Sequence, residues 1–138
     1  MNLGFIGTGK IASSVIKGIC KSSIRYDKII ISYRNKKISK NLKKRFKKIS
    51  IEKNNQTIID RSDWIFLAIT PTVGKKILKD LKFKSRHTII SFISTITLPE
   101  LKKITKIKKN IIRAIPLPPI ALKKGPVPIY PPHKKVKS

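Results

Sequence analysis

The sequence has little of what secreted, membrane-spanning or disulfide-stabilised proteins need. Its single cysteine, Cys20, cannot form an internal disulfide and has no second cysteine with which to bind a metal. No apolar run approaches the roughly 20 residues of a membrane-spanning helix. The N-terminus begins at once on a strand-like run, without the basic stretch and cleavage site of a signal peptide. We therefore expect a cytoplasmic protein that makes no use of a membrane.

Acidic residues are also scarce, with 6 Asp and Glu against 33 Lys and Arg and a formal net charge of +27. Such an excess of cations attracts nucleic acids and anionic membranes through counterion release. However, lysines are spread over the whole chain and isoleucine is equally over-used, a joint bias that AT-rich codon usage produces without any partner. The aromatic content is only 7%, and no nucleic-acid-binding motif is present. We expect no specific nucleic-acid partner.

The 138 residues suffice for one domain, and as far as about position 115 apolar runs alternate with segments of helical period. The pattern predicts strands at 3–6, 29–31, 64–69, 87–93 and 111–115. It predicts helices at 11–22, 38–49, 56–61, 73–81 and 98–105, the last opened by a capping box from Thr97 to Glu100. Alternation of this kind is typical of βαβ units, so we predict an α/β fold with a doubly wound, mostly parallel sheet over residues 1–115.

Residues 116–138 differ in composition from the rest of the chain. They contain seven prolines, which exclude a regular helix and a central strand: Pro116, Pro118, Pro119, Pro126, Pro128, Pro131 and Pro132. We expect an extended crossing segment that ends in a basic, solvated tail from His133 onward.

A glycine motif lies between the first predicted strand and the first predicted helix. It has the form Gly-x-Gly-x-x-Ala and consists of Gly7, Thr8, Gly9, Lys10, Ile11 and Ala12. Gly7 allows a tight turn, Gly9 lets the backbone approach a pyrophosphate, and Ala12 permits close packing of the helix on the strand. The free N–H groups at the helix start then face the anion. In this setting the motif predicts a Rossmann dinucleotide-binding domain.

The end of the second predicted strand indicates which dinucleotide is bound. NAD-specific domains place an Asp or Glu about 20 residues beyond the glycines, where it accepts hydrogen bonds from the ribose hydroxyls. This chain instead has the hydroxyl of Ser32, the guanidinium of Arg34, and Lys36 and Lys37 behind them. These groups suit the dianionic 2′-phosphate of NADP(H), which we predict to be preferred over NAD(H).

The chain resembles the pyrroline-5-carboxylate reductases in several elements that occur in the family's order. Residues 4–12, Gly-Phe-Ile-Gly-Thr-Gly-Lys-Ile-Ala, resemble the opening of these enzymes, and Asn55 precedes residues 63–71 as their Asn precedes an Ala-Val-Lys-Pro element. Residues 90–98 stand where the family has an Ala-Ala-Gly-Ile-Thr loop, and residues 113–116, Arg-Ala-Ile-Pro, resemble its Arg-x-Met-Pro. Hydroxyisobutyrate and 6-phosphogluconate dehydrogenases and F420-dependent NADP reductases share the opening alone.

The resemblance implies an enzyme of proline biosynthesis, an NADP-dependent oxidoreductase that transfers hydride from NADPH to a cyclic imine. Residues 7–12 would then hold the pyrophosphate, Arg34 would meet the adenosine phosphate, and Asn55 would contact the adenosine side. The ribose and nicotinamide would be flanked by Ala68, Ile69, Thr70, Pro71 and Ser94. No metal site is expected, and no catalytic residue is assigned, since the proton can come from substrate or water.

Departures from the family's pattern leave the exact substrate open. Thr70 replaces the lysine of the family's Lys-Pro, and Leu117 and Pro118 replace an Asn and a Thr whose side chains could form hydrogen bonds. The family's helical dimerisation domain is missing, so we expect a fragment or truncated product that forms a homodimer or a higher oligomer only with that domain. The alternative is a stand-alone NAD(P)-binding or regulatory domain that carries out no reaction.

Overall fold

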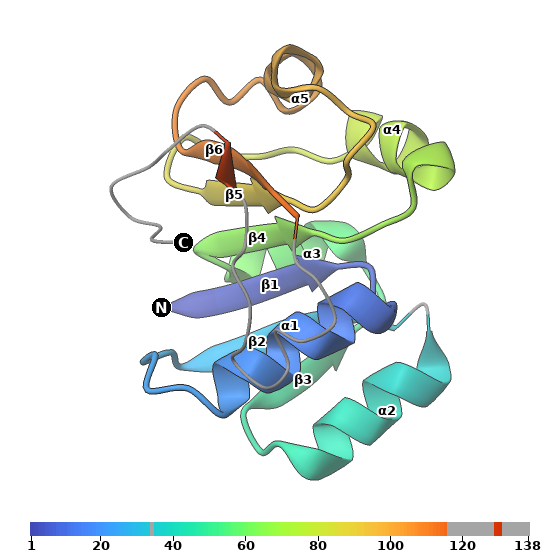
Figure 1. The fold of residues 1–138 in the computed structure, drawn as a ribbon, viewed down its shortest axis with the longest axis vertical. Coiled ribbons are helices and arrows are strands. Elements are labelled where there is room, and N and C mark those ends of the chain that lie inside the picture. Colours follow the sequence, from blue (N-terminus) through green and yellow to red (C-terminus); the bar gives the residue numbers. More distant parts are fainter. Residues whose placement is uncertain (34, 116–128, 131–138) are drawn as a thin grey trace.

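The computed structural model describes residues 1–33, 35–115 and 129–130 of the chain. Their strands form one sheet in the order β3-β2-β1-β4-β5-β6-β7 (Figure 1). All neighbouring strands from β3 to β6 are parallel, whereas β7 pairs antiparallel with β6. The bounds are β1 (Asn2–Ile6), β2 (Lys28–Ser32), β3 (Ile49–Glu52), β4 (Trp64–Leu67), β5 (Thr88–Ser91), β6 (Ile111–Ala114) and β7 (Ile129–Tyr130).

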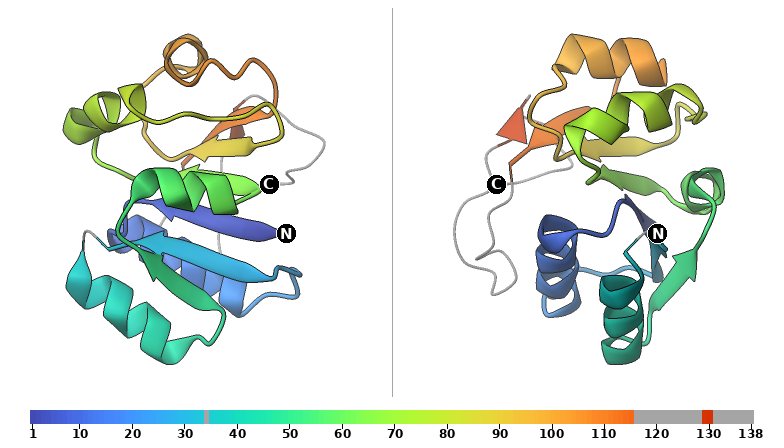
Figure 2. Two further views of the ribbon diagram at one scale, coloured as in Figure 1. Left: turned by 180° about the vertical axis from the view of Figure 1, so that it is seen from behind. Right: turned by 90° about the vertical axis from the view of Figure 1, so that its right-hand side faces the viewer.

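Helices cover both faces of this sheet (Figures 1 and 2). Buried side chains of α1 (Lys10–Cys20) and α2 (Lys36–Arg45) pack in one hydrophobic cluster. Those of α3 (Asn55–Arg61), α4 (Pro71–Lys79) and α5 (Leu98–Thr105) pack in the other. The predicted doubly wound, mostly parallel α/β fold is therefore confirmed. Within the described residues, no helix has both the length and the apolar character needed to cross a membrane.

The central strands are apolar on both faces because each face packs against helices. Along β1, Leu3 and Phe5 belong to the cluster beneath α1, whereas Ile6 belongs to the opposite cluster. Phe5 stacks on Phe66 of the neighbouring β4, with ring centroids 4.4 Å apart. The predicted cap is present as well, since Thr97 accepts a hydrogen bond from the Glu100 N–H at the start of α5.

The predicted helix over residues 38–49 was wrong at its C-terminal end. Helix α2 ends at Arg45, Phe46 is extended, and Ile49 begins β3, where it pairs with Ile29 and is 4% exposed. The spacing from Leu42 through Phe46 to Ile49 continues the helical stripe, and no Gly or Pro marks the break. Burial against β2 therefore decides the conformation, and sequence analysis missed this strand.

Two further expectations concern the ends of strands and the proline-rich segment. Strand β4 ends at Leu67 and β5 spans only Thr88–Ser91, so both predicted strands were too long. Strand β7 lies at the sheet edge, which agrees with the exclusion of a central strand there. The other proline-rich residues and the tail lie outside the described residues, so the expectation for them stays a prediction.

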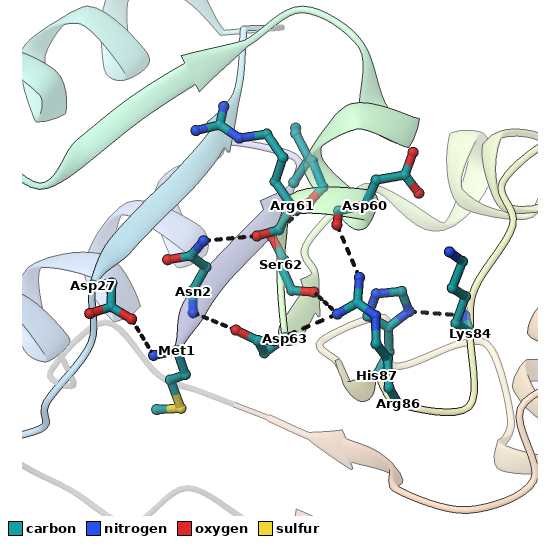
Figure 3. Close-up of polar contacts among 11 residues, drawn as sticks. Met1, Asn2, Asp27, Asp60, Arg61, Ser62, Asp63, Lys84, Arg86 and His87 are labelled. Atoms are coloured by element: carbon teal, nitrogen blue, oxygen red, sulfur yellow. Dashed lines mark hydrogen bonds and ion pairs between the residues drawn. The ribbon is translucent and has the colours of Figure 1, made fainter.

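Polar contacts connect the amino ends of several strands (Figure 3). The N-terminal ammonium of Met1 pairs with Asp27, and the Asn2 N–H donates to Asp63 at 2.7 Å. The Arg86 guanidinium donates to two main-chain carbonyls near the end of α3, each at 3.0 Å, and lies 3.5 Å from Asp63. These contacts link the beginnings of β1, β2, β4 and β5.

A buried histidine completes this edge. His87 has no solvent exposure, and its Nδ1 accepts the Lys84 N–H at 2.9 Å, whereas its Nε2 has no hydrogen-bond partner among the described residues. Burial lowers the pKa of His87 below its ordinary value of 6.5 and the charge of the adjacent Arg86 lowers it further, whereas the backbone of Ile59 and the carboxylates of Asp60 and Asp63 offset only part of this lowering. The neutral imidazole is therefore the form that the fold accommodates.

Gly4→Ala should destabilise the fold, because a Cβ at this position would lie 2.2 Å from Ser62 Oγ and 2.9 Å from Ile58 Cγ2. We expect the free energy of unfolding in urea to fall by about 1–3 kcal/mol. The matched control is Gly9→Ser, since a Cβ on Gly9 meets no atom within 4 Å among the residues that the structure describes. Equal destabilisation by both substitutions would contradict the packing role of Gly4.

Stability should fall as the pH decreases below about 6.5, because the unfolded chain then binds a proton at His87 that the folded chain resists. Urea unfolding between about pH 5 and pH 8 measures this slope, and His87→Gln should flatten it. The pKa values of Asp27 and Glu100 are lowered by their cationic partners, so these groups stay ionised throughout this range. His133→Gln is the control, and an equal flattening there would exclude His87 as the cause.

Candidate functional site

The loops that follow β1, β2, β3 and β4 meet at the carboxyl edge of the sheet, where the strand order reverses between β1 and β4 (Figure 1). Ligands of open α/β sheets bind at such a reversal. The first of two hollows here has a volume of about 410 Å³ and is lined by Gly7, Thr8, Gly9, Asn35, Lys36, Ala68, Ile69 and Thr70. The second has about 330 Å³ and is lined by Gly7, Ser32, Tyr33, Lys53, Asn55, Ile69 and Ile77.

Gly7 stands at the junction of the two hollows and requires glycine for two reasons. Its φ of +98° is a backbone conformation that side chains with a Cβ rarely adopt. A Cβ would also lie 2.6 Å from the carbonyl oxygen of Ala68. The chain can therefore turn from β1 into α1 while in contact with the β4 loop only if this residue is glycine.

Gly9 differs from Gly7 because no atom of the described residues requires a glycine there. Its backbone is extended, and a Cβ would meet none of these atoms within 4 Å. Gly9 lies at the N-cap of α1 and supplies no side-chain cap, so the first N–H groups of the helix are left to other partners. Ala12, one turn into the helix, is fully buried against the sheet, as the motif predicts. Such a helix start beside a hollow can hold an anion.

Ser32 ties the glycine loop to the end of β2. Its Oγ accepts the Gly7 N–H at 3.1 Å and lies 2.8 Å from the Thr8 hydroxyl, which also donates to the Ser32 carbonyl at 2.8 Å. Ser32 is 4% exposed, and Thr8 is 3% exposed. The hydroxyl that the sequence suggested for a phosphate contact is thus hydrogen-bonded within the loop, where it supports the turn.

The structure brings most of the other predicted site residues to this edge. Asn55 lines the second hollow, and Ala68, Ile69 and Thr70 line the first. Residues 10–12 form the first turn of α1 beside them. Pro71 and Ser94 line neither hollow; Pro71 begins α4, and the exposed Ser94 lies in the loop after β5, where its carbonyl accepts a hydrogen bond from Arg113. Arg34 lies outside the described residues.

Sequence analysis missed four lining residues, namely Tyr33, Asn35, Lys53 and Ile77. Asn35 also caps α2, where its side chain accepts the Ile38 N–H at 3.2 Å. Lys53 could not be assigned to the site, because it follows β3, a strand that the sequence pattern did not predict. In the described part of the chain, no three His, Cys, Asp or Glu side chains gather as metal ligands.

The fold and the glycine loop define a Rossmann domain of the NAD(P)-binding class. Residues 2–95 match the family described as NADP oxidoreductase coenzyme F420-dependent, and the chain belongs to that family. It is 32% identical over 130 residues to pyrroline-5-carboxylate reductase 3 of Danio rerio, a match that covers 91% of this chain and 44% of that protein. Pyrroline-5-carboxylate reductase 2 of Homo sapiens is 25% identical over 131 residues, and this match covers 91% of this chain and 41% of that protein.

Solved structures agree with this relationship. The 1-pyrroline-5-carboxylate reductase of Streptococcus pyogenes is 30% identical with a TM-score of 0.67, over 83% of this chain and 42% of that one. The pyrroline carboxylate reductase of Plasmodium falciparum, solved with NADP bound, is 21% identical and shares the fold with a TM-score of 0.79. This match covers 100% of this chain and 50% of that one. The chain spans less than half the length of its curated relatives. It is a domain of this oxidoreductase family and is similar to part of pyrroline-5-carboxylate reductase.

Ser32→Ala should lower the free energy of unfolding by about 1–3 kcal/mol, because the buried Gly7 N–H loses its acceptor. It should also weaken NADPH and NADH by the same factor, since the loop that it supports serves both dinucleotides. Urea unfolding and calorimetric titration measure the two effects, with Ser85→Ala, an exposed serine that lines neither hollow, as the control. A loss confined to NADPH would instead indicate direct contact of Ser32 with the 2′-phosphate.

Proposed function

We propose that this chain is the cofactor-binding half of an NADP(H)-dependent reductase of the pyrroline-5-carboxylate reductase type. The observation that carries the proposal is Gly9, a glycine that no atom of the described residues requires, at the start of α1 and lining the hollow between β1 and β4. A glycine at this position is explained if the backbone here must approach a pyrophosphate closely. The curated relatives supply the reaction class, reduction of a cyclic imine.

The chain's own part in the reaction is to bind and orient the dinucleotide. The backbone of residues 7–9 and the free N–H groups of α1 hold the pyrophosphate. Ala68, Ile69 and Thr70 form the opposite wall and, together with Pro71 and the Ser94 loop, flank the ribose and nicotinamide. When bound, NADPH supplies the hydride that reduces the imine carbon, and the proton comes from substrate or water.

The charges at the carboxyl edge of the sheet support the proposed preference for NADP(H) over NAD(H). Among the described lining residues of both hollows none is acidic, whereas Lys36 and Lys53 are cationic. NAD-specific domains place a carboxylate at the end of β2, and this chain has Ser32 and Tyr33 there. Arg34, which follows directly in the sequence, is proposed to meet the 2′-phosphate.

The proposed substrate is a cyclic imine or a related small molecule, in proline biosynthesis. Leu117 and Pro118, which leave its exact identity open, lie outside the described residues. Homodimer formation through a helical domain, a cytoplasmic location and the lack of a nucleic-acid partner stay predictions.

Gly9→Val should abolish dinucleotide binding and leave the fold intact, because its side chain would occupy the hollow and its Cβ would meet no atom of the described part of the chain within 4 Å. Calorimetric titration with NADPH measures the affinity, and urea unfolding checks the fold. The control is Ser23→Val, which places the same side chain on an exposed residue beyond the other end of α1.

Unchanged affinity in a folded Gly9→Val variant would refute the cofactor site. If the native protein binds NADPH but reduces no cyclic imine, the alternative of a stand-alone NAD(P)-binding domain that carries out no reaction is favoured.

A further inference from the structure

The second hollow contains an aromatic ring with two cations beside it. The ammonium groups of Lys36 and Lys53 each lie 5.5 Å from the centroid of the Tyr33 ring, so they lie within twice that distance of each other. Lys36 is the first residue of α2, and Lys53 directly follows β3. Tyr33 and Lys53 are brought together because the residues before them, Ser32 and Glu52, are partners in the parallel pairing of β2 with β3.

No carboxylate of the described residues neutralises these two cations. None of the ion pairs between described residues includes Lys36 or Lys53. The nearest carboxylate in sequence, that of Glu52, is paired with Arg61 at 2.7 Å. Each ammonium group is attracted to the electron-rich face of the Tyr33 ring, which is a weaker partner than a carboxylate. An anion bound beside the ring would supply the counter-charge that the described residues do not.

The surroundings of the cations specify what kind of anion fits. Lys53 and Tyr33 line a hollow of about 330 Å³ together with the polar side chains of Ser32 and Asn55 and the apolar Ile77. This hollow meets the glycine-loop hollow at Gly7 and Ile69, which belong to both. A ligand that fills both therefore needs one anionic group at the glycine loop and a second near the lysines. A dinucleotide with a phosphate on its adenosine ribose meets both requirements.

We infer that Tyr33, Lys36 and Lys53 form the adenosine-phosphate subsite of this domain and that Lys53 is a specificity-determining residue for NADP(H). The inference rests on the proposed function and adds a residue from β3 to it. Each lysine has a flexible stem, so its ammonium group can move from the ring to the 2′-phosphate and donate charge-assisted hydrogen bonds. The Tyr33 ring, once vacated, offers an apolar face to the adenine.

The test compares Lys53→Gln with the unchanged chain by calorimetric titration of NADP⁺ and NAD⁺ at one ionic strength. The substitution should weaken NADP⁺ about tenfold to a hundredfold, as expected for one charge-assisted contact. NAD⁺, which lacks the 2′-phosphate, should change by less than about twofold. Lys47→Gln removes the same charge from an exposed lysine that lines neither hollow, and it should leave both affinities unchanged.

Equal weakening of both dinucleotides by Lys53→Gln, or no weakening of either, would overturn the role of Lys53 and leave the proposed function intact. A second probe, adenosine 2′,5′-bisphosphate against adenosine 5′-monophosphate, tests the subsite without the nicotinamide. If the bisphosphate binds in a Lys53-dependent manner while neither dinucleotide binds, the subsite is supported and the proposed function fails. If no nucleotide binds to the unchanged chain, both fail.

Discussion

The contact between Gly7 and the β4 loop is the constraint on which the rest of the site depends. The Ala68 N–H donates to the Ile6 carbonyl at 2.8 Å, so β1 and β4 remain paired up to the turn. A Cβ on Gly7 would lie 2.6 Å from the Ala68 carbonyl, so the chain must leave the sheet there with a glycine. Ser32 then fixes the turn from the other neighbouring strand. The hollows lie where they do because β1 is held between β2 and β4.

The scarcity of acidic residues has a local structural consequence. At the amino edge of the sheet, Asp27 and Asp63 bind the chain terminus, the Asn2 N–H and Arg86. At the carboxyl edge the described lining residues include no carboxylate, and Glu52, which lies nearby in sequence, is paired with Arg61. Anionic groups of the protein therefore connect strands at one edge and leave the other edge cationic. The basic composition, which by itself indicates no partner, here leaves two lysines beside a hollow without a counterion among the described residues.

The sequence predicted those parts of the fold and site that depend on local patterns. The turn at Gly7, the packing of Ala12 and the cap at Thr97 each follow from a few neighbouring residues, and all three are present. Strand β3 could not be predicted, because Ile49 continues the apolar stripe of the preceding helix and only pairing with β2 reveals it as a strand. Lys53 was missed for the same reason, since its place at the edge depends on β3. The hydrogen bonding of Ser32 within the loop also requires the spatial proximity of two strands.

The order of the loops along the edge sets the direction in which a dinucleotide would lie. With the adenosine beside Tyr33 and Lys53 and the pyrophosphate at the glycine loop, the nicotinamide falls beyond β1, toward the loops after β4 and β5. Arg113 of β6 donates to the Ser94 carbonyl there, and so connects the β5 loop to the next strand. In the arrangement proposed here, the substrate would approach from the β5 and β6 side of the sheet. Residues that determine the reaction would then lie there, whereas the residues proposed to select the cofactor lie at the ends of β2 and β3.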